Sequence, residues 1–124
     1  MQLLAFFFLL LTPFCVDTNP LFDAYNTSIS IKQEHERLDN YAIQIKNSTG
    51  SRALLVVYAE KEETAKSVKA RARRAVNYLV KTRGLNPARV VWRYDGACRH
   101  NEILLYVLYP DQADPARDTN CLRD

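Results

Sequence analysis

The sequence predicts a small α/β sandwich in which two helices cover one face of a mixed sheet. Three segments in the middle of the chain carry this prediction: an apolar run over 52–59, a long amphipathic segment over 61–83, and a second strand-like segment from Arg89. An almost wholly apolar run is typical of a strand covered on both faces. Strand, helix and strand in this order form a right-handed βαβ unit. With the flanking segments the order becomes β-α-β-α-β-β, an α+β two-layer sandwich.

Two elements are expected before the βαβ unit. The segment Leu21–Tyr25 alternates loosely between apolar and polar residues and predicts a short strand. Ser30 is a favourable helix N-cap, and Gln33 three residues later completes a capping box. We therefore expect a helix from Ser30 to about Lys46, ended by the turn-forming residues 47–50.

The helix of the βαβ unit is expected from about Lys61 to Arg83. Apolar residues recur at three- and four-residue steps, and Gly84 provides the left-handed residue that ends a helix. The segment contains eight Lys or Arg residues against two Glu, a net charge of +6, whereas the whole chain carries +3. This basic face is either simply solvated or binds an anionic partner such as anionic lipid or a cell-wall polymer. Nucleic acid is disfavoured because Tyr78 is the only aromatic residue of the helix.

In the C-terminal third we expect a strand, a turn and a last strand. The strand that starts at Arg89 should end at Tyr94, because Asp95 and Gly96 form a turn signal at the start of a loop. The apolar run 103–109 predicts a last strand, antiparallel to the preceding one. Residues 111–124 are polar, and we expect a loose tail.

The chain of 124 residues is long enough for one domain, which we place at residues 19–110. Residues 1–18 contain the uncharged apolar run Leu3–Leu11, which has the length of a signal-peptide core. This segment predicts export, and it is either removed or retained as a membrane anchor. Lipidation of Cys15 is a further alternative, although the bulky Phe14 precedes it. Contact with a membrane is expected only through this segment.

The chain carries no motif of a known enzyme class. Its three glycines form no phosphate-binding loop, and no serine lies in a Gly-x-Ser-x-Gly motif. His35 stands between two glutamates but falls on the apolar side of the first helix, where a packing role is expected. The cysteine spacing fits no metal site, so we expect no metal and no cofactor. In an exported chain Cys98 and Cys121 could form a disulfide; two unpaired thiols are the alternative.

Several residue pairs in the second half of the chain occur in a recognisable order: Arg71-Ala72, Tyr78-Leu79, Gly84-Leu85, Pro87-Ala88 and Arg89-Val90. In this order they resemble the OmpA C-terminal domain family, the peptidoglycan-binding module of bacterial envelope proteins. The resemblance covers about Leu21 to Tyr109, and the family has the same β-α-β-α-β-β order of elements.

The resemblance implies a non-enzymatic envelope module located in the periplasm or cell envelope. In the family, an acid after the second strand meets the ammonium of diaminopimelate, and an arginine of the second helix pairs with its carboxylate. The corresponding residues here are Glu60 and Arg71. The segment between them is shorter than in the family and lacks its glycine and asparagine. The alternative is an OmpA-like fold that has lost peptidoglycan binding and serves as an extracytoplasmic protein-interaction domain, with an envelope protein as its partner.

Overall fold

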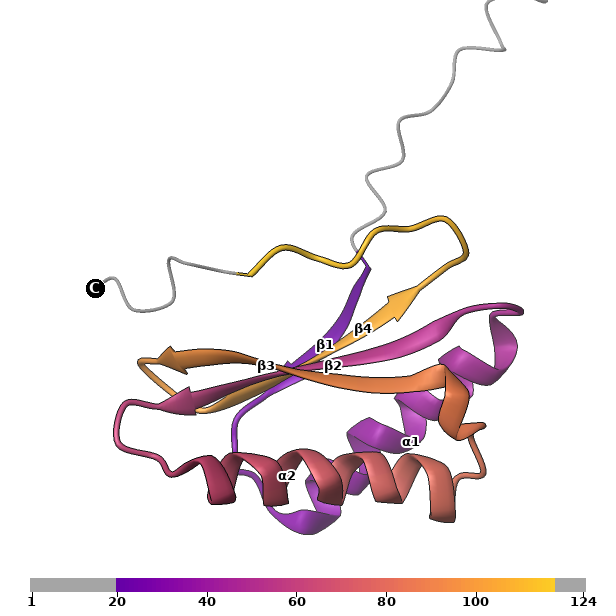
Figure 1. Cartoon of the computed structure of the whole chain (residues 1–124). Helices are drawn as coiled ribbons and strands as arrows, with labels where there is room; N and C mark the ends of the chain where they lie inside the picture. The colour runs from indigo at the N-terminus through magenta and orange to yellow at the C-terminus, as the bar shows by residue number, and fades with distance from the viewer. Residues whose placement is uncertain (1–19, 118–124) are drawn as a thin grey trace, which may run out of the picture.

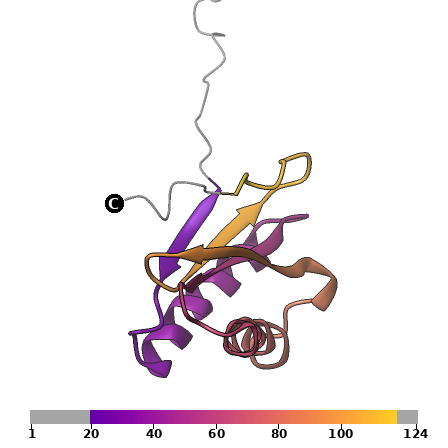
Figure 2. The same ribbon diagram turned by 60° about the vertical axis from the view of Figure 1, so that its left-hand side comes forward.

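Four strands form one mixed sheet, and both helices pack on the same face of it (Figures 1 and 2). The computed structural model describes residues 20–117. The strands are β1 (Leu21–Tyr25), β2 (Arg52–Glu60), β3 (Val90–Cys98) and β4 (Glu102–Leu108), in the spatial order β1-β4-β2-β3. Strand β2 is parallel to β3 and antiparallel to β4, and β4 is also antiparallel to β1. The expected two-layer α+β fold is confirmed.

The first helix, α1 (Ile31–Asn47), starts with the capping box that the sequence predicts. The Ser30 hydroxyl accepts a hydrogen bond from the Gln33 N–H at 3.1 Å, and the Gln33 side chain accepts one from the Ser30 N–H at 2.9 Å. These bonds satisfy two N–H groups that a helix start would otherwise leave unpaired.

The second helix, α2 (Ala65–Asn77), starts later than the expected Lys61. Strand β2 continues through Glu60, and Thr64 is the N-cap, its hydroxyl accepting a hydrogen bond from the Ser67 N–H at 3.2 Å. A single π-helical turn (Tyr78–Thr82) extends the helix. Gly84 then closes it at φ +73°, a conformation that glycine adopts without strain.

The main core lies between the sheet and the two helices. Alternate residues of β2 face the helices, as the two-residue period of a strand requires. The buried side chains of this cluster include Leu55 and Val57 of β2, Leu38, Tyr41 and Ile45 of α1, Val68, Ala72 and Ala75 of α2, and Ile103 and Leu105 of β4.

The expected turn at Asp95 and Gly96 is wrong, because both residues lie inside β3. Asp95 is buried and pairs with Arg93 at 2.6 Å, and Gly96 has φ +106° beside a register shift between β2 and β3. The two residues therefore form an irregularity within the strand, and the chain turns only after Cys98. Strand β4 runs opposite to β3, as expected, but pairs with β2 and β1 instead.

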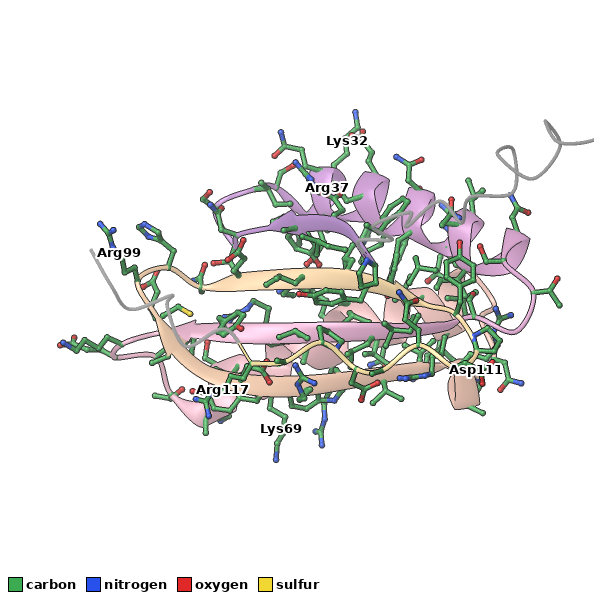
Figure 3. All side chains as sticks on the ribbon, turned by 90° about the horizontal axis from the view of Figure 1, so that it is seen from above. Lys32, Arg37, Lys69, Arg99, Asp111 and Arg117 are labelled. Atoms are coloured by element: carbon green, nitrogen blue, oxygen red, sulfur yellow. The ribbon has the colours of Figure 1, made fainter. Side chains whose placement is uncertain are left out.

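Residues 111–117 form no helix or strand, but they contact the face of the sheet opposite the helices. Asp114 forms an ion pair with Arg52 at 2.5 Å, and the Pro115 carbonyl accepts a hydrogen bond from Arg93 at 2.9 Å. Arg93 is the register partner of Val56, a member of a second, smaller buried cluster. Figure 3 shows the segment crossing the sheet toward Arg117.

Within residues 20–117, no helix is both long and apolar enough to cross a membrane. The expected signal or anchor segment, residues 1–18, lies outside the described residues.

Candidate functional site

An open cleft of about 380 Å³ lies beside the N-terminal half of α2. Three separate segments line it: the β1–α1 connection with the first residue of α1, the stretch of α2 as far as Arg74 with the residue before its cap, and the turn between β3 and β4. These segments meet at one end of the sandwich (Figure 1). The lining residues are Thr27, Ile29, Ile31, Glu63, Ser67, Ala70, Arg71, Arg74 and Asn101.

Arg71 is the most buried charged group of the cleft, with 5% of the residue exposed. Its Nη2 donates to the Tyr58 carbonyl near the end of β2 at 2.7 Å, and its Nη1 donates to the Glu63 carboxylate. Its Nε is buried and has no hydrogen-bond partner in the described part of the protein. The guanidinium is therefore fixed in position and keeps one unused donor, an uncommon state for a buried polar group.

Glu63 is held from several sides. Besides Arg71, it accepts hydrogen bonds from the Ser67 hydroxyl at 2.8 Å and from the Glu60 N–H at 3.2 Å. Partial burial raises the pKa of the Glu63 carboxyl, but the hydrogen bonds from Arg71, Ser67 and the Glu60 backbone outweigh burial and hold it below the ordinary value. The cleft thus presents an ionised carboxylate at neutral pH.

Arg74, which also lines the cleft, belongs to a second ion pair behind it. Glu34 of α1 is 3% exposed and accepts hydrogen bonds from Arg74 Nε at 2.8 Å and from the Tyr25 hydroxyl at 2.7 Å. Burial, together with the negative charge of Glu34, raises the pKa of the Tyr25 hydroxyl, which stays protonated and donates. The Arg74 side chain remains 48% exposed, so its guanidinium is also available to a ligand in the cleft.

Of the two residues that the sequence suggests as a site, Arg71 lines the cleft and Glu60 does not. Glu60 ends β2 with its side chain exposed, in register with Cys98, and makes no ion pair with Arg71 among the described residues. Glu63, and not Glu60, is the acid that pairs with Arg71, because the chain turns after β2 before it reaches the Thr64 cap of α2. The sequence feature that could have indicated Glu63 is Thr64. Threonine is a favourable N-cap, and the residue before an N-cap lies at the N-terminal end of the helix.

The other candidate residues have structural roles. The ring of His35 stacks on Tyr78 with 3.9 Å between ring centroids, as expected of a packing side chain. Across residues 20–117, no group of three or more His, Cys, Asp or Glu side chains could hold a metal ion. Cys98 is disulfide-bonded. Since Cys98 is the one cysteine between residues 20 and 117, its partner lies outside the described residues, and pairing with Cys121 stays a prediction.

Comparison of the chain with protein-family models and with curated proteins finds no match. Functional inference therefore depends on the residues of the cleft itself.

Proposed function

We propose that this domain is a non-enzymatic binding module of the bacterial cell envelope whose cleft holds a zwitterionic amino acid. The ligand we propose is the diaminopimelate group of peptidoglycan. The observation that supports this most directly is the fixed pair of Glu63 and Arg71 in the wall of an open, polar cleft. A volume of about 380 Å³ fits a small ligand.

The chemistry of the cleft suits both ends of a zwitterion. Glu63 is ionised and offers acceptors to an ammonium group. Arg71 and the half-exposed Arg74 supply two guanidinium groups for a carboxylate, the pairing in which arginine makes its strongest hydrogen bonds. Thr27, Ser67 and Asn101 add polar groups around the rim.

Two features support an exported location. Cys98 takes part in a disulfide, a bond typical of oxidising compartments such as the periplasm. The apolar run Leu3–Leu11 is typical of an export signal or anchor.

One observation favours a second candidate, a protein-interaction domain that does not bind peptidoglycan. Glu63 and Arg71 already neutralise each other, so the pair does not require a ligand to be stable. On this interpretation the cleft is a structural ion-pair network, and the domain contacts an envelope protein with another surface.

Co-sedimentation with purified peptidoglycan sacculi tests the proposal. We expect the nearly isosteric change Glu63→Gln to weaken binding by about tenfold or more, since a hydrogen bond to a charged group contributes about 1.5–3 kcal/mol. The matched control is Glu62→Gln, which removes the same charge from an exposed neighbouring residue. Glu60→Gln provides a third comparison, for the acid that the sequence suggests.

The result that would contradict the proposal is equal sedimentation of the wild type and Glu63→Gln at low salt. Loss of binding in Glu60→Gln but not in Glu63→Gln would instead assign the ammonium to Glu60.

A further inference from the structure

The cations of α2, of its π-helical extension and of the following residue, Arg83, fall into two sets. Arg71, Arg74 and Arg83 each pair with an acid, respectively Glu63, Glu34 and Asp39. The second set consists of Lys66, Lys69, Arg73 and Lys81, which we call the cationic stripe. Its members are exposed and form no ion pair within residues 20–117.

The cationic stripe lies along one outward face of the helix. The spacing of its members returns to the same side of a helix, opposite the buried residues Val68, Ala72 and Ala75. From Lys66 to Lys81 it extends about 22 Å at 1.5 Å per residue. Figure 3 shows Lys69 projecting from one side of the molecule and Lys32 of α1 projecting from the other.

The cationic stripe does not improve the stability of the helix. No Asp or Glu occurs between residues 65 and 83, so no intrahelical acid offsets it. Lys69 and Arg73 are like charges at i and i+4, a spacing that destabilises a helix. Lys66 and Lys69 also stand near the positive end of the helix dipole, where cations are unfavourable. The result is a concentrated positive potential on this face.

We propose that the cationic stripe docks a linear phosphodiester polymer that carries no bases, of the poly(glycerol phosphate) kind. A row of charges about 22 Å long matches a chain that carries one negative charge per repeating unit, and such binding gains from the release of counterions. The sequence predicts that the basic helix is either solvated or bound to an anionic partner, and the cations that form no ion pair within residues 20–117 point to this face for such a partner.

The composition of the cationic stripe argues against other anionic partners. It has no apolar side chain that could insert into a lipid surface or anchor a folded protein. It has no aromatic ring on which nucleic-acid bases could stack. Charge and hydrogen bonding alone remain, with Asn77 among the four cations.

The position of α2 in the fold agrees with this assignment. In Figure 1 the helix lies below the sheet. The start of β1 and the segment after β4 both lie above the sheet. The cationic stripe is therefore presented on the side away from the points where the described chain enters and leaves. This inference does not depend on the cleft or on its proposed ligand.

Binding of the full chain to immobilised poly(glycerol phosphate), measured over a series of salt concentrations, tests the proposal. The variant Lys66→Gln/Lys69→Gln removes two charges from the cationic stripe. The matched control, Lys32→Gln/Lys46→Gln, removes two exposed lysines of α1 that form no ion pair with any residue of 20–117. At about 0.7 per phosphate contact, the first variant should flatten the log–log salt slope by about 1.4 and weaken binding about twentyfold at 0.1 M salt.

Three results would overturn the proposal. Equal weakening in both variants would show that only net charge matters. Absence of wild-type binding at low salt would exclude the polymer as a partner. Tighter binding to vesicles of phosphatidylglycerol than to the polymer, with the same dependence on Lys66 and Lys69, would assign the face to a membrane instead.

Discussion

At the scale of single residues, Arg89 joins the end of α1 to the start of β2. Its guanidinium donates to the carbonyl groups of Ile45, Ser48 and Ser51 at 2.7–3.2 Å, and to the Ser51 hydroxyl at 3.1 Å. Because its removal would leave several half-buried acceptors without a partner, Arg89→Ala should lower the free energy of unfolding by about 3 kcal/mol.

Urea denaturation would measure the effect of Arg89→Ala. Arg89→Lys should recover only part of the loss, since a single ammonium cannot reach all of these acceptors. An exposed arginine, Arg73, serves as the control, and its change to alanine should stay within about 0.5 kcal/mol. Equal effects at the two positions would contradict this account of Arg89.

Glu63 gives a prediction about pH. Its folded-state pKa lies below the ordinary value of 4.5, so its contribution to stability is complete above that pH. The contribution is lost as the pH falls below 4.5 and through the folded-state pKa. Thermal unfolding should therefore separate the wild type from Glu63→Gln at neutral pH, and the separation should shrink as the pH is lowered below 4.5. Melting curves that stay equally far apart throughout this acid range would exclude this linkage.

At the scale of single residues, the sequence predicts one residue of the cleft, Arg71, but not the acid beside it. The resemblance locates Arg71 by its neighbours along the helix, but it expects Arg71 and Glu60 to hold a ligand between them, whereas Arg71 pairs directly with Glu63. The identity of the acid depends on where the chain turns between β2 and α2, and a difference of three residues separates Glu60 from Glu63. Asn101 and Thr27 could not be found, because only the folded chain brings them to the cleft.

At the scale of elements, the start of α2 positions the site. Thr64 caps the helix, with Glu63 on one side and Ser67 on the other. Thr64→Ala should cost about 1 kcal/mol of stability, the usual effect of losing an N-cap. It should also weaken sacculus binding, because Glu63 loses its fixed position. Thr64→Ser keeps the hydroxyl and should restore both stability and sacculus binding, as measured by urea denaturation and co-sedimentation. If the serine variant does not restore binding, the N-cap does not position the site.

Local signals decide how well each element can be predicted. The capping box at Ser30 fixes the start of α1 because all of its bonds lie within four residues. Asp95 and Gly96 look like a turn, but Asp95 bonds to Arg93, whose guanidinium also reaches Pro115. That last contact spans 22 residues, so a local turn signal cannot reveal it.

At the scale of the whole molecule, we expect the disulfide of Cys98 to hold the C-terminal segment on the domain. It would act together with the contacts that Asp114 and Pro115 make with the sheet. We expect the partner of Cys98 to be Cys121, so that the bond fixes the C-terminal residues over the end of β3. Peptide mapping of the oxidised protein should find Cys98 linked to Cys121, and reduction should cost about 3 kcal/mol of stability. A Cys98–Cys15 link would contradict this prediction and would tie the N-terminal segment to the domain.

Strand order is also a property of the whole molecule. The sequence predicts the number and order of elements, but the insertion of β2 between β3 and β4 depends on contacts distant in the chain. The continuous apolar character of β2 agrees with its central place, since it is covered on both faces.

The central claim is that the cleft recognises a zwitterionic amino acid through Glu63 and the two arginines. Titration of isotopically labelled protein with meso-diaminopimelate, followed by amide chemical shifts, tests it most directly. We predict saturable shifts at Glu63, Ser67, Arg71 and Asn101, their loss in Glu63→Gln, and their retention in Glu62→Gln. N,N′-Diacetylated diaminopimelate should shift these signals less, because both amino groups are acylated and it carries no ammonium. Absence of saturable shifts around the cleft, or equal shifts in both variants, would contradict the claim.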